Sequence, residues 1–572
     1  MSTFRLITGV LGRTVLLPYF RKSFSDYRSN LTHARELQER FLLDRIRRCG
    51  KTTFGRQHAF DDITSVKDFQ SRVPIRDYAD MKPYLDAVTA DDSLALIPEG
   101  ERIIDFSCTT GTTGTPKVLP VTDVWLKNYQ NYWRIWGTKT LIDNPGIFGN
   151  YWLQLTAPLD IGETANGRAI SMVSSLSAKH QSRLFQSFYA TPYELGAIQD
   201  PEIRQHAQIR IAMAHPVGFI ITITAANLIR LAEQGNAAKE QFIREIHDGT
   251  IAGRSTIAHH LGERRLARLT RPDPQRARQL AQLAEKHDRL LPKHYWPLQL
   301  ICCWTSGTVG YQTQQLNEYF GQTPVRDIGY ISTEGRHTIP EQNGSPIGAL
   351  VPTGAFYEFE PITQPSRIQL GHEIAQGEDY EVILTTSNGL YRYRMGDIVR
   401  CHGHIGDSPL FEFVRKTADY SDMEGEKLSG DQIALAMMQA RKFTTLATSH
   451  TSAVAVRPQQ GSPYYAFILE NHEIGDSTAG ETFLDIIDKS LRDMNVMYRQ
   501  KRADNSLGSP ILHLVEDGTW QRFYDTRGAE RRTGVSQFKH PPFLEVQVLS
   551  KFAICRTITI GADPAKKIAK SA

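Results

Sequence analysis

Apolar side chains recur at helical spacing in two long stretches of the chain. Residues 28–49 have this pattern, with Asn30 or Thr32 available as an N-cap and Gly50 as a stop. Residues 273–291 begin with Asp-Pro, the favoured order at a helix start. Both stretches predict scaffold helices.

Short apolar runs alternate with turns in the middle of the chain. Five of them have the β-branched and aromatic composition that is typical of strands. These runs are residues 298–304, 325–332, 355–360, 380–386 and 409–414. We therefore expect this part of the chain to be rich in sheet.

Residues 211–229 are the one stretch apolar enough to suggest a membrane span. His215, Pro216 and Asn227 dilute it, and charged segments lie on either side. We therefore expect buried core here and no stable membrane insertion. At the N-terminus Arg13 interrupts the apolar run, which favours an amphipathic helix over a targeting segment.

The pattern changes after Phe413. Residues 414–430 are charged, and the chain beyond them has the order helix, strand, strand, helix, strand. The predicted elements are residues 431–443, 453–457, 464–470, 483–498 and 511–517. This order suits a compact α+β unit, so we expect a large α/β domain over residues 1–418 and a smaller one over residues 419–572.

Composition and charge narrow the functional classes. The chain has 572 residues, of which 40% are hydrophobic and 22% charged, so it can bury a large core. A net charge of +4 is small for this length and argues against a nucleic-acid-binding protein. The six cysteines form no CxxC pair, which predicts reduced thiols in a cytoplasmic protein.

Residues 108–120, "CTTGTTGTPKVLP", place threonines and glycines between two apolar runs. Such a loop lets successive backbone N–H groups converge, and its hydroxyls add donors, which suits a polyphosphate. Lys117 adds a mobile cation. The spacing is not that of a Walker A loop, and a plain hydrophilic connection between strands remains the alternative.

Two further stretches support a nucleotide site. "YISTE" (330–334) ends a predicted strand and carries Glu334, a candidate ligand for a magnesium ion that bridges phosphates. "LYRYRMGD" (390–397) ends in Asp397, which we expect in a tight glycine turn where it can accept hydrogen bonds from ribose hydroxyls. Each stretch is weak alone, but their order and spacing together are specific.

The three stretches stand in the order of the signature motifs of adenylate-forming enzymes. In detail the chain resembles one branch, the Gretchen Hagen acyl acid amido synthetases of the auxin-responsive promoter family. The segments that carry the resemblance are "WTSGTVGY" (304–311), "FYEFEP" (356–361), "NGLYRYRMGD" (388–397), "FEFVRK" (411–416), "EGEKLS" (424–429) and "SQFKHP" (536–541). The resemblance covers residues 15–550 and implies a large adenylation domain with a mobile C-terminal domain.

The resemblance assigns a group of residues to ATP. Its members are Thr109, Thr110, Gly111, Thr112 and Thr113 in the phosphate loop, Thr308 beside the nucleotide, Tyr330, Ser332, Thr333 and Glu334 at the adenine and magnesium, and Asp397 at the ribose. It also implies three catalytic lysines. Lys117 closes the phosphate loop, and Lys427 and Lys539 approach the nucleotide from the C-terminal domain.

The acid pocket departs from the family pattern. Members that bind aromatic acids can hold the carboxylate with an arginine at the position of Trp136. Arg134 would be turned by about 200° from that position on a helix, so we expect a different pocket here. Tyr129, Tyr132, Trp133 and Trp136 form an aromatic stripe, for which core packing and a pocket wall are both open.

The predicted function is the activation of a carboxylic acid with ATP and Mg²⁺, followed by transfer of the acyl group to an amine such as that of an amino acid. Two alternatives remain. One is an adenylate-forming ligase whose acceptor is coenzyme A, a carrier thiol or an alcohol. The other is a nucleotide-binding regulatory protein that has kept the fold without turnover.

Overall fold

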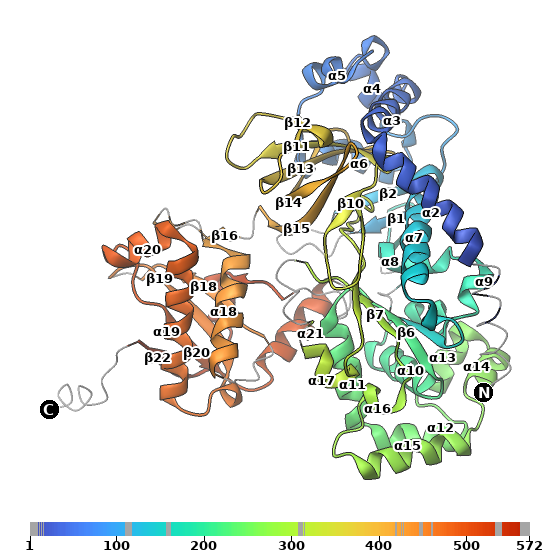
Figure 1. Cartoon of the computed structure of the whole chain (residues 1–572), viewed down its shortest axis with the longest axis vertical. Helices are drawn as coiled ribbons and strands as arrows, with labels where there is room; N and C mark the ends of the chain where they lie inside the picture. The colour runs from blue at the N-terminus through green and yellow to red at the C-terminus, as the bar shows by residue number, and fades with distance from the viewer. Residues whose placement is uncertain are drawn as a thin grey trace. The chain divides into compact units, whose positions relative to one another are not determined.

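The chain forms two compact units in the computed structural model (Figure 1). The model describes residues 17–108, 117–155, 162–306, 315–417, 428–444, 450–458, 461–531 and 540–560, together with residues 10, 12, 14, 159, 313, 420, 421, 423, 424 and 426. The larger unit comprises Met1–Ser306, Gln312–Phe413 and Arg532–Gln537. The smaller unit comprises Gly307–Tyr311, Val414–Arg531 and Phe538–Ala572.

A parallel sheet lies at the centre of one core of the larger unit. Its strand order is β3 (Tyr151–Gln154), β6 (Val217–Ile221), β7 (Leu300–Cys303) and β8 (Val325–Asp327). Every residue of β6 and β7 is buried, as is typical of parallel strands covered on both faces. The apolar stretch 211–229 is thus buried core, as predicted, and it contains β6.

The larger unit has two further sheets. The four-stranded sheet has the order β2 (Val118–Thr122), β1 (Ile103–Cys108), β5 (Ala169–Ser171) and β4 (Gly162–Glu163). The seven-stranded sheet has the order β12 (Gln369–Leu370), β11 (Ala355–Pro361), β13 (Asp379–Thr386), β14 (Tyr393–Ile405), β15 (Ser408–Lys416), β10 (Gly348–Leu350) and β9 (Thr338–Pro340). The five predicted strand runs all contain strands, although β8 ends well before residue 332.

Helices surround these sheets. They are α2 (Leu17–Thr32), α3 (Ala34–Cys49), α4 (Thr53–Gln57), α5 (Val66–Arg72), α6 (Tyr78–Thr89), α7 (Asp123–Asp143), α8 (Val173–Lys179), α9 (Arg183–Gln186), α10 (Pro201–Met213), α11 (Ala225–Ala237), α12 (Lys239–Asp248), α13 (Arg254–Leu261), α14 (Glu263–Leu269), α15 (Pro274–Lys286), α16 (Pro292–Tyr295) and α17 (Leu316–Phe320). The side chain of Asp273 caps α15 by accepting from the backbone of Arg276, as its place before proline predicts.

The predicted single helix over residues 28–49 is wrong at its start. The chain breaks at His33, which has φ −121° and ψ 28°, and separate helices lie on either side of it. No side chain caps the second helix at this break, so neither Asn30 nor Thr32 serves as the predicted N-cap. The predicted end is right, because α3 stops at Cys49.

The smaller unit is a mixed sheet packed against helices. The sheet order is β21 (Phe543–Leu544), β18 (Ser452–Val456), β19 (Tyr464–Glu470), β20 (Ile511–Val515) and β22 (Ile554–Thr559). A short pair, β16 (Tyr420–Ser421) and β17 (Leu428–Ser429), precedes it. The helices are α18 (Gly430–Thr444), α19 (Ser477–Met494), α20 (Val496–Ala503), α21 (Thr519–Arg531) and α22 (Val546–Leu549).

The helix predicted over residues 483–498 is also two helices. Asn495 separates them, and its side chain caps α20 by accepting from the backbone of Tyr498. Asparagine is a strong N-cap, so the apolar periodicity concealed a helix start. The α+β character of this unit agrees with the prediction.

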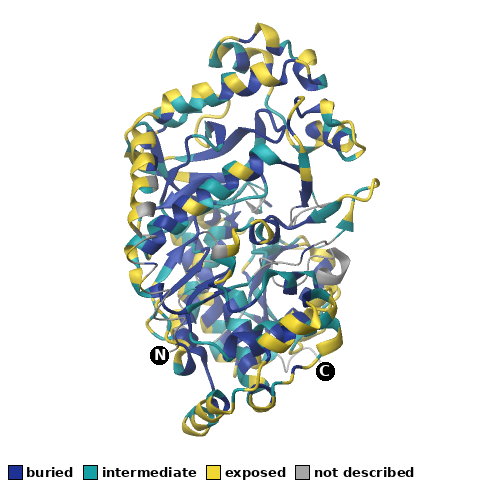
Figure 2. Ribbon diagram, turned by 90° about the vertical axis from the view of Figure 1, so that its right-hand side faces the viewer, coloured by how far each residue is buried: buried dark blue, intermediate teal, exposed yellow. Residues whose placement is uncertain are grey.

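Burial follows the sheets. Dark blue buried residues lie on the strands and on the inner faces of the helices (Figure 2). All six cysteines are free, as predicted, and only Cys555 is exposed. Among the described residues no helix has the length and apolarity needed to cross a membrane.

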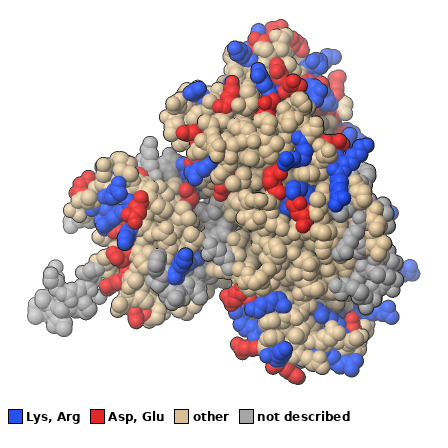
Figure 3. All heavy atoms as spheres, viewed as in Figure 1, with Lys and Arg blue, Asp and Glu red and all other residues tan. Residues whose placement is uncertain are grey.

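Surface charge is mixed. On the face in Figure 3 basic and acidic side chains lie intermixed over the larger unit. Part of the arginine-rich stretch 264–278 has structural contacts: Arg265 pairs with Glu194, and Arg276 donates to the backbone carbonyls of Met213 and Tyr295.

Candidate active site

The second and third sequence motifs meet through one hydrogen bond. The hydroxyl of Tyr330 donates to Asp397 Oδ2 at 2.5 Å, and both residues are buried. Burial, followed by the charge of Asp397, raises the pKa of Tyr330 well above its ordinary value. Tyr330 therefore remains a proton donor to the aspartate.

Asp397 lies within strand β14, which corrects the tight turn expected from the sequence. The register of β14 against β13 shifts between Glu381 and Ile383, and Gly396 has a φ of +70°. A β-bulge explains both features, because glycine accepts the left-handed conformation that the extra residues require. The bulge interrupts the pairing of β14 with β13 at this carboxylate.

The segment around Glu334 is a tight hairpin. Ile331 bridges to Arg336, and the backbone N–H of Ser332 donates to the carbonyl of Gly335 at 2.9 Å. Ser332 Oγ contacts His337 Nε2 at 2.9 Å and accepts from the backbone N–H of Glu334 at 3.1 Å. Thr333 lies at the bend between them.

Glu334 fits a divalent cation. It is only 6% exposed, and its charge acts on the neighbouring Tyr393, whose pKa it raises. A largely buried carboxylate is stabilised by a cation, and oxygen is the donor that Mg²⁺ prefers. The backbone carbonyl of Glu334 accepts from Trp125 Nε1 at 2.9 Å, which connects this hairpin to the first turn of α7.

Lys117 lies beside the same strand as Asp397. Its Nζ donates to the hydroxyl of Tyr393 at 2.7 Å and lies 5.4 Å from the ring centroids of Tyr78 and Tyr393. Burial, followed by the charges of Glu334 and Asp397, raises the pKa of Tyr393. The lysine and the two carboxylates therefore surround one tyrosine.

Several predicted residues lie outside the described residues. They are Thr109, Thr110, Gly111, Thr112, Thr113, Thr308, Lys427 and Lys539. The strands that flank the first group are antiparallel, and Cys108 is the partner of Val118 in their register. The ends of the predicted phosphate loop are thus neighbours in one sheet.

Asp327 is a site residue that the sequence did not reveal. Its Oδ2 accepts from both the backbone N–H and the hydroxyl of Thr305 at 2.6 Å, and its Oδ1 accepts from Gly329 N at 2.5 Å. Burial raises the pKa of Asp327 to about 6. The carboxylate joins the end of β8 to the chain that leaves β7 towards residues 307–311.

A cavity of about 560 Å³ opens at the carboxyl edge of the parallel sheet. Its walls come from α7, from α8 and the residues after it, and from the ends of β3 and β6. In open α/β sheets this edge is where ligands bind. The cavity therefore lies where a substrate of the larger unit is expected.

The lining divides into an apolar and a polar part. Aromatic residues of the lining are Trp133, Trp136, Trp152, Phe185, Tyr189 and Phe219. Polar residues of the lining include Gln130, Arg134, Ser177, His180, Gln181 and Ser182. Burial and the nearby Lys179 lower the pKa of His180, so this side chain is neutral at pH 7.

The aromatic stripe on α7 serves both purposes that the sequence left open. Trp133 and Trp136 line the cavity, whereas Tyr129 stacks on Trp125 at 4.8 Å and Tyr132 contacts Thr353 in the core. Trp136 is buried, and its Nε1 donates to the carbonyl of Asp327 at 3.1 Å.

Arg134 also lines the cavity, although it is turned far from Trp136 on the helix. The lining residues cover a wide arc of α7, and this is why both side chains reach it. Arg134 is exposed and donates to the neutral Asn131 at 2.6 Å. It is the one Lys or Arg among the described lining residues.

Arg336 is a second residue that sequence reasoning missed. Its guanidinium lies 4.3 Å from the ring centroid of Trp133 and 5.5 Å from that of Trp136, and it donates to the carbonyl of Ile328 at 2.5 Å. Burial lowers the pKa of Arg336 to about 9. The arginine thus supports the two tryptophans of the cavity wall through cation–π contacts.

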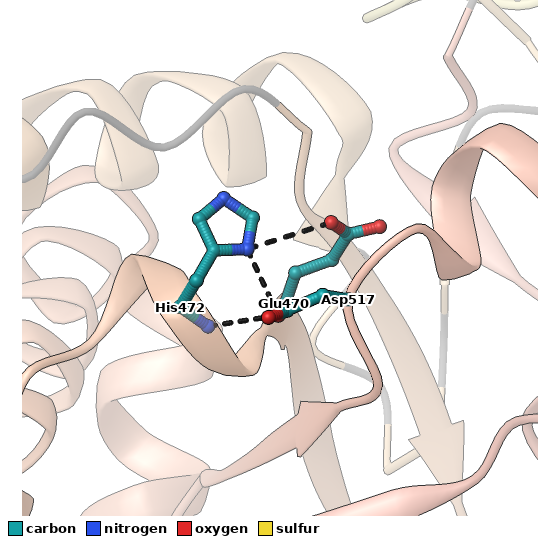
Figure 4. A group of neighbouring side chains, drawn as sticks. All are labelled: Glu470, His472 and Asp517. Atoms are coloured by element: carbon teal, nitrogen blue, oxygen red, sulfur yellow. Dashed lines mark hydrogen bonds and ion pairs between the residues drawn. The ribbon is translucent and has the colours of Figure 1, made fainter.

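One cluster of potential metal ligands lies in the smaller unit (Figure 4). His472 Nδ1 is 2.9 Å from Asp517 Oδ1, and Glu470 accepts from the backbone N–H of Trp520 at 2.8 Å. These contacts fasten the end of β19 to the start of α21. Protein hydrogen bonds therefore account for the closeness of the three side chains.

The second and third sequence motifs thus meet in a mixed α/β fold, the fold class that the sequence predicted. The chain belongs to the GH3 family. Residues 24–325 match the GH3 family N-terminal domain, residues 348–416 the central domain and residues 431–547 the C-terminal domain.

Known proteins that are similar to this chain match it over most of its length and of their own. The indole-3-acetic acid-amido synthetase GH3.4 of Arabidopsis thaliana is 22% identical over 92% of each chain. The jasmonoyl-L-amino acid synthetase JAR4 of Nicotiana attenuata is 24% identical over 89% of this chain and 91% of its own. The solved structure of the GH3.15 acyl acid amido synthetase matches with a TM-score of 0.81 at 19% identity, over 94% of this chain and 97% of its own.

Proposed function

We propose that the protein is an ATP-dependent acyl acid amido synthetase. It joins a carboxylic acid to AMP with release of pyrophosphate, and it then transfers the acyl group to the amine of an amino acid. The observation that carries the proposal is the convergence of Tyr330, Asp397 and Lys117 in the unit that holds the cavity. The chemistry of the named relatives agrees with it.

In the first step a carboxylate oxygen of the acid attacks the α-phosphorus of ATP, and the bond to pyrophosphate breaks. Negative charge spreads over the phosphate oxygens in this transition state. The N–H groups of the loop 109–116 and the ammonium of Lys117 stabilise that charge. Mg²⁺ held by Glu334 neutralises phosphate charge when it is bound.

In the second step the amine nitrogen attacks the acyl carbon, the bond to AMP breaks, and the nitrogen loses a proton. Lys427 and Lys539 act as point charges near the nucleotide in one or the other step. Neither step needs a covalent enzyme intermediate. A replacement of Lys539 by alanine is expected to slow adenylation while ATP still binds.

The cavity beside α7 holds the acid. Its buried aromatic part accepts an apolar body, and the cation of Arg134 at its exposed part attracts the carboxylate. Among the described residues no Asp or Glu lines it. Because its thiols are unpaired, the protein suits a reducing compartment such as the cytoplasm.

The test is mass spectrometry of the products formed from ATP, Mg²⁺, pooled carboxylic acids, pooled amino acids and coenzyme A. An amide together with AMP and pyrophosphate supports the proposal. A thioester of coenzyme A would support the other class of acceptor. A protein that binds ATP but exchanges no pyrophosphate with any acid would be a regulatory binder.

A further inference from the structure

Helix α7 has a glycine at a position where nothing local requires one. Gly137 lies inside the helix with ordinary helical φ, and glycine is among the weakest helix formers. A Cβ added at this position would meet no atom within 4 Å. Neither backbone conformation nor a close neighbour therefore explains the residue.

The space in front of Gly137 belongs to the cavity beside α7. Gly137 lies one turn beyond Arg134 and one turn before Leu141, and all three residues line that cavity. Arg134 is exposed, whereas Leu141 is 4% exposed. The cavity therefore passes from an open, polar end, across the glycine, to a closed, apolar end.

The helix also gives the cavity a direction relative to the nucleotide residues. Trp125, in the first turn of the helix, donates to the backbone carbonyl of Glu334. The open end of the cavity at Gln130 and Arg134 is therefore nearer the hairpin of Glu334 than the closed end at Leu141 is. From Gln130 to Leu141 the helix rises about 16 Å. An acid whose carboxylate reaches ATP must point its body towards the closed end.

We propose that Gly137 sets the depth of the acid site, and that the substrate is a long or bulky apolar acid whose body passes this glycine. Beyond it, Leu141, Ile147 and Trp152 offer a buried apolar end that a short acid would leave unfilled. Each further buried methylene is expected to raise kcat/KM about fourfold until the end is filled. This inference rests on the proposed function for the identity of the ligand as an acid.

The test compares two probes, phenylacetic acid and 8-phenyloctanoic acid, in pyrophosphate exchange. In Gly137→Leu the new side chain would occupy the space between the two ends, and leucine favours the helix, so the variant is expected to fold. We expect the variant to lose at least about 100-fold of kcat/KM for the long acid and less than about threefold for the short one. The kcat/KM of Gly137→Ala for the long acid should lie between those of wild type and Gly137→Leu.

Lys127→Leu is the matched control, because Lys127 is exposed on the same helix and does not line the cavity. This control variant should leave the ratio of kcat/KM for the two acids unchanged. Equal effects of Gly137→Leu on both acids, or no effect on either, would overturn the inference. A wild type that prefers the short acid would overturn it as well.

A binding measurement separates this inference from the proposed function. Isothermal titration of 8-phenyloctanoic acid into wild type and Gly137→Leu reports the depth of the cavity without catalysis. Binding that the substitution abolishes, in a protein that exchanges no pyrophosphate, would support the site and refute the synthetase. No binding to the wild type, even with ATP present, would refute the site.

Discussion

Tyr330 and Asp397 are 67 residues apart in the chain, and a 2.5 Å hydrogen bond joins them in the structure. The bond links the second motif to the third, because the Tyr330 hydroxyl orients the Asp397 carboxylate. The family resemblance assigns this carboxylate to the ribose. Both residues are buried, so the loss of either partner removes a hydrogen bond from a buried polar group.

Tyr330→Phe and Asp397→Asn should therefore differ in their effects on stability and on the KM for ATP. Tyr330→Phe removes a donor to a buried charge and should lower the free energy of unfolding by about 1.5–3 kcal/mol. Asp397→Asn keeps an acceptor for the tyrosine but loses the charge, so it should raise the KM for ATP with a smaller loss of stability. Urea unfolding and pyrophosphate exchange measure the two effects, and identical profiles for both variants would contradict the pairing.

Glu334→Gln tests the metal site. The substitution keeps the shape of the side chain and removes the negative charge that would hold Mg²⁺. We expect kcat/KM for ATP to fall about 100-fold, with partial recovery as the Mg²⁺ concentration rises. Glu341→Gln is the control, since Glu341 pairs with Arg28 at the surface. The same Mg²⁺ dependence in wild type and Glu334→Gln would remove Glu334 from the metal.

Arg134→Gln tests the open end of the acid cavity. An exposed cation contributes modestly, so the KM for the acid should rise up to about fivefold while kcat stays unchanged. The effect should shrink with added salt because the charge is screened. Lys127→Gln removes the same charge from the same helix away from the cavity and should change nothing. A fall in kcat alone would place Arg134 in the chemical step instead.

Asp327 predicts a pH dependence of stability. Its pKa is raised to about 6, so between about pH 4 and pH 6 the folded protein holds a proton that the unfolded chain has lost. The stabilisation is complete below about pH 4 and is lost as the pH rises through 6. Relative to Asp327→Asn, the wild type should lose about 3 kcal/mol of unfolding free energy from pH 4 to pH 7. Chemical unfolding of both proteins across this range measures the difference, and parallel curves would show that Asp327 does not titrate there.

The sequence predicted most elements whose pattern is local. Apolar runs located β7, β11 and β13, and the Asp-Pro pair located the start of α15. The sequence pattern did not predict the helix breaks at His33 and Asn495, because helical periodicity continues across both of them. At Asn495 the capping asparagine was a usable sign, whereas at His33 the predicted caps Asn30 and Thr32 do not cap the helix.

The site was predictable only where a motif marked it. Tyr330 and Asp397 came from motif order, but Asp327 and Arg336 act through tertiary partners, Thr305 and Trp133, that no local pattern connects to them. The aromatic spacing on α7 suggested one wall of the cavity. Its opposite wall comes from strand ends that only the folded sheet brings near.

The contact between Trp125 and Glu334 fixes the first turn of α7 against the hairpin of Glu334. The number of turns of this one helix fixes the distance from the hairpin of Glu334 to the far end of the cavity. Replacement of the side chains of α7 that line the cavity would keep this distance and would change which acids fit. An insertion or deletion of a single residue between Trp125 and Gly137 would instead rotate everything beyond it by about 100°. Divergence within the lineage should therefore proceed here by replacement and leave the length of this segment constant.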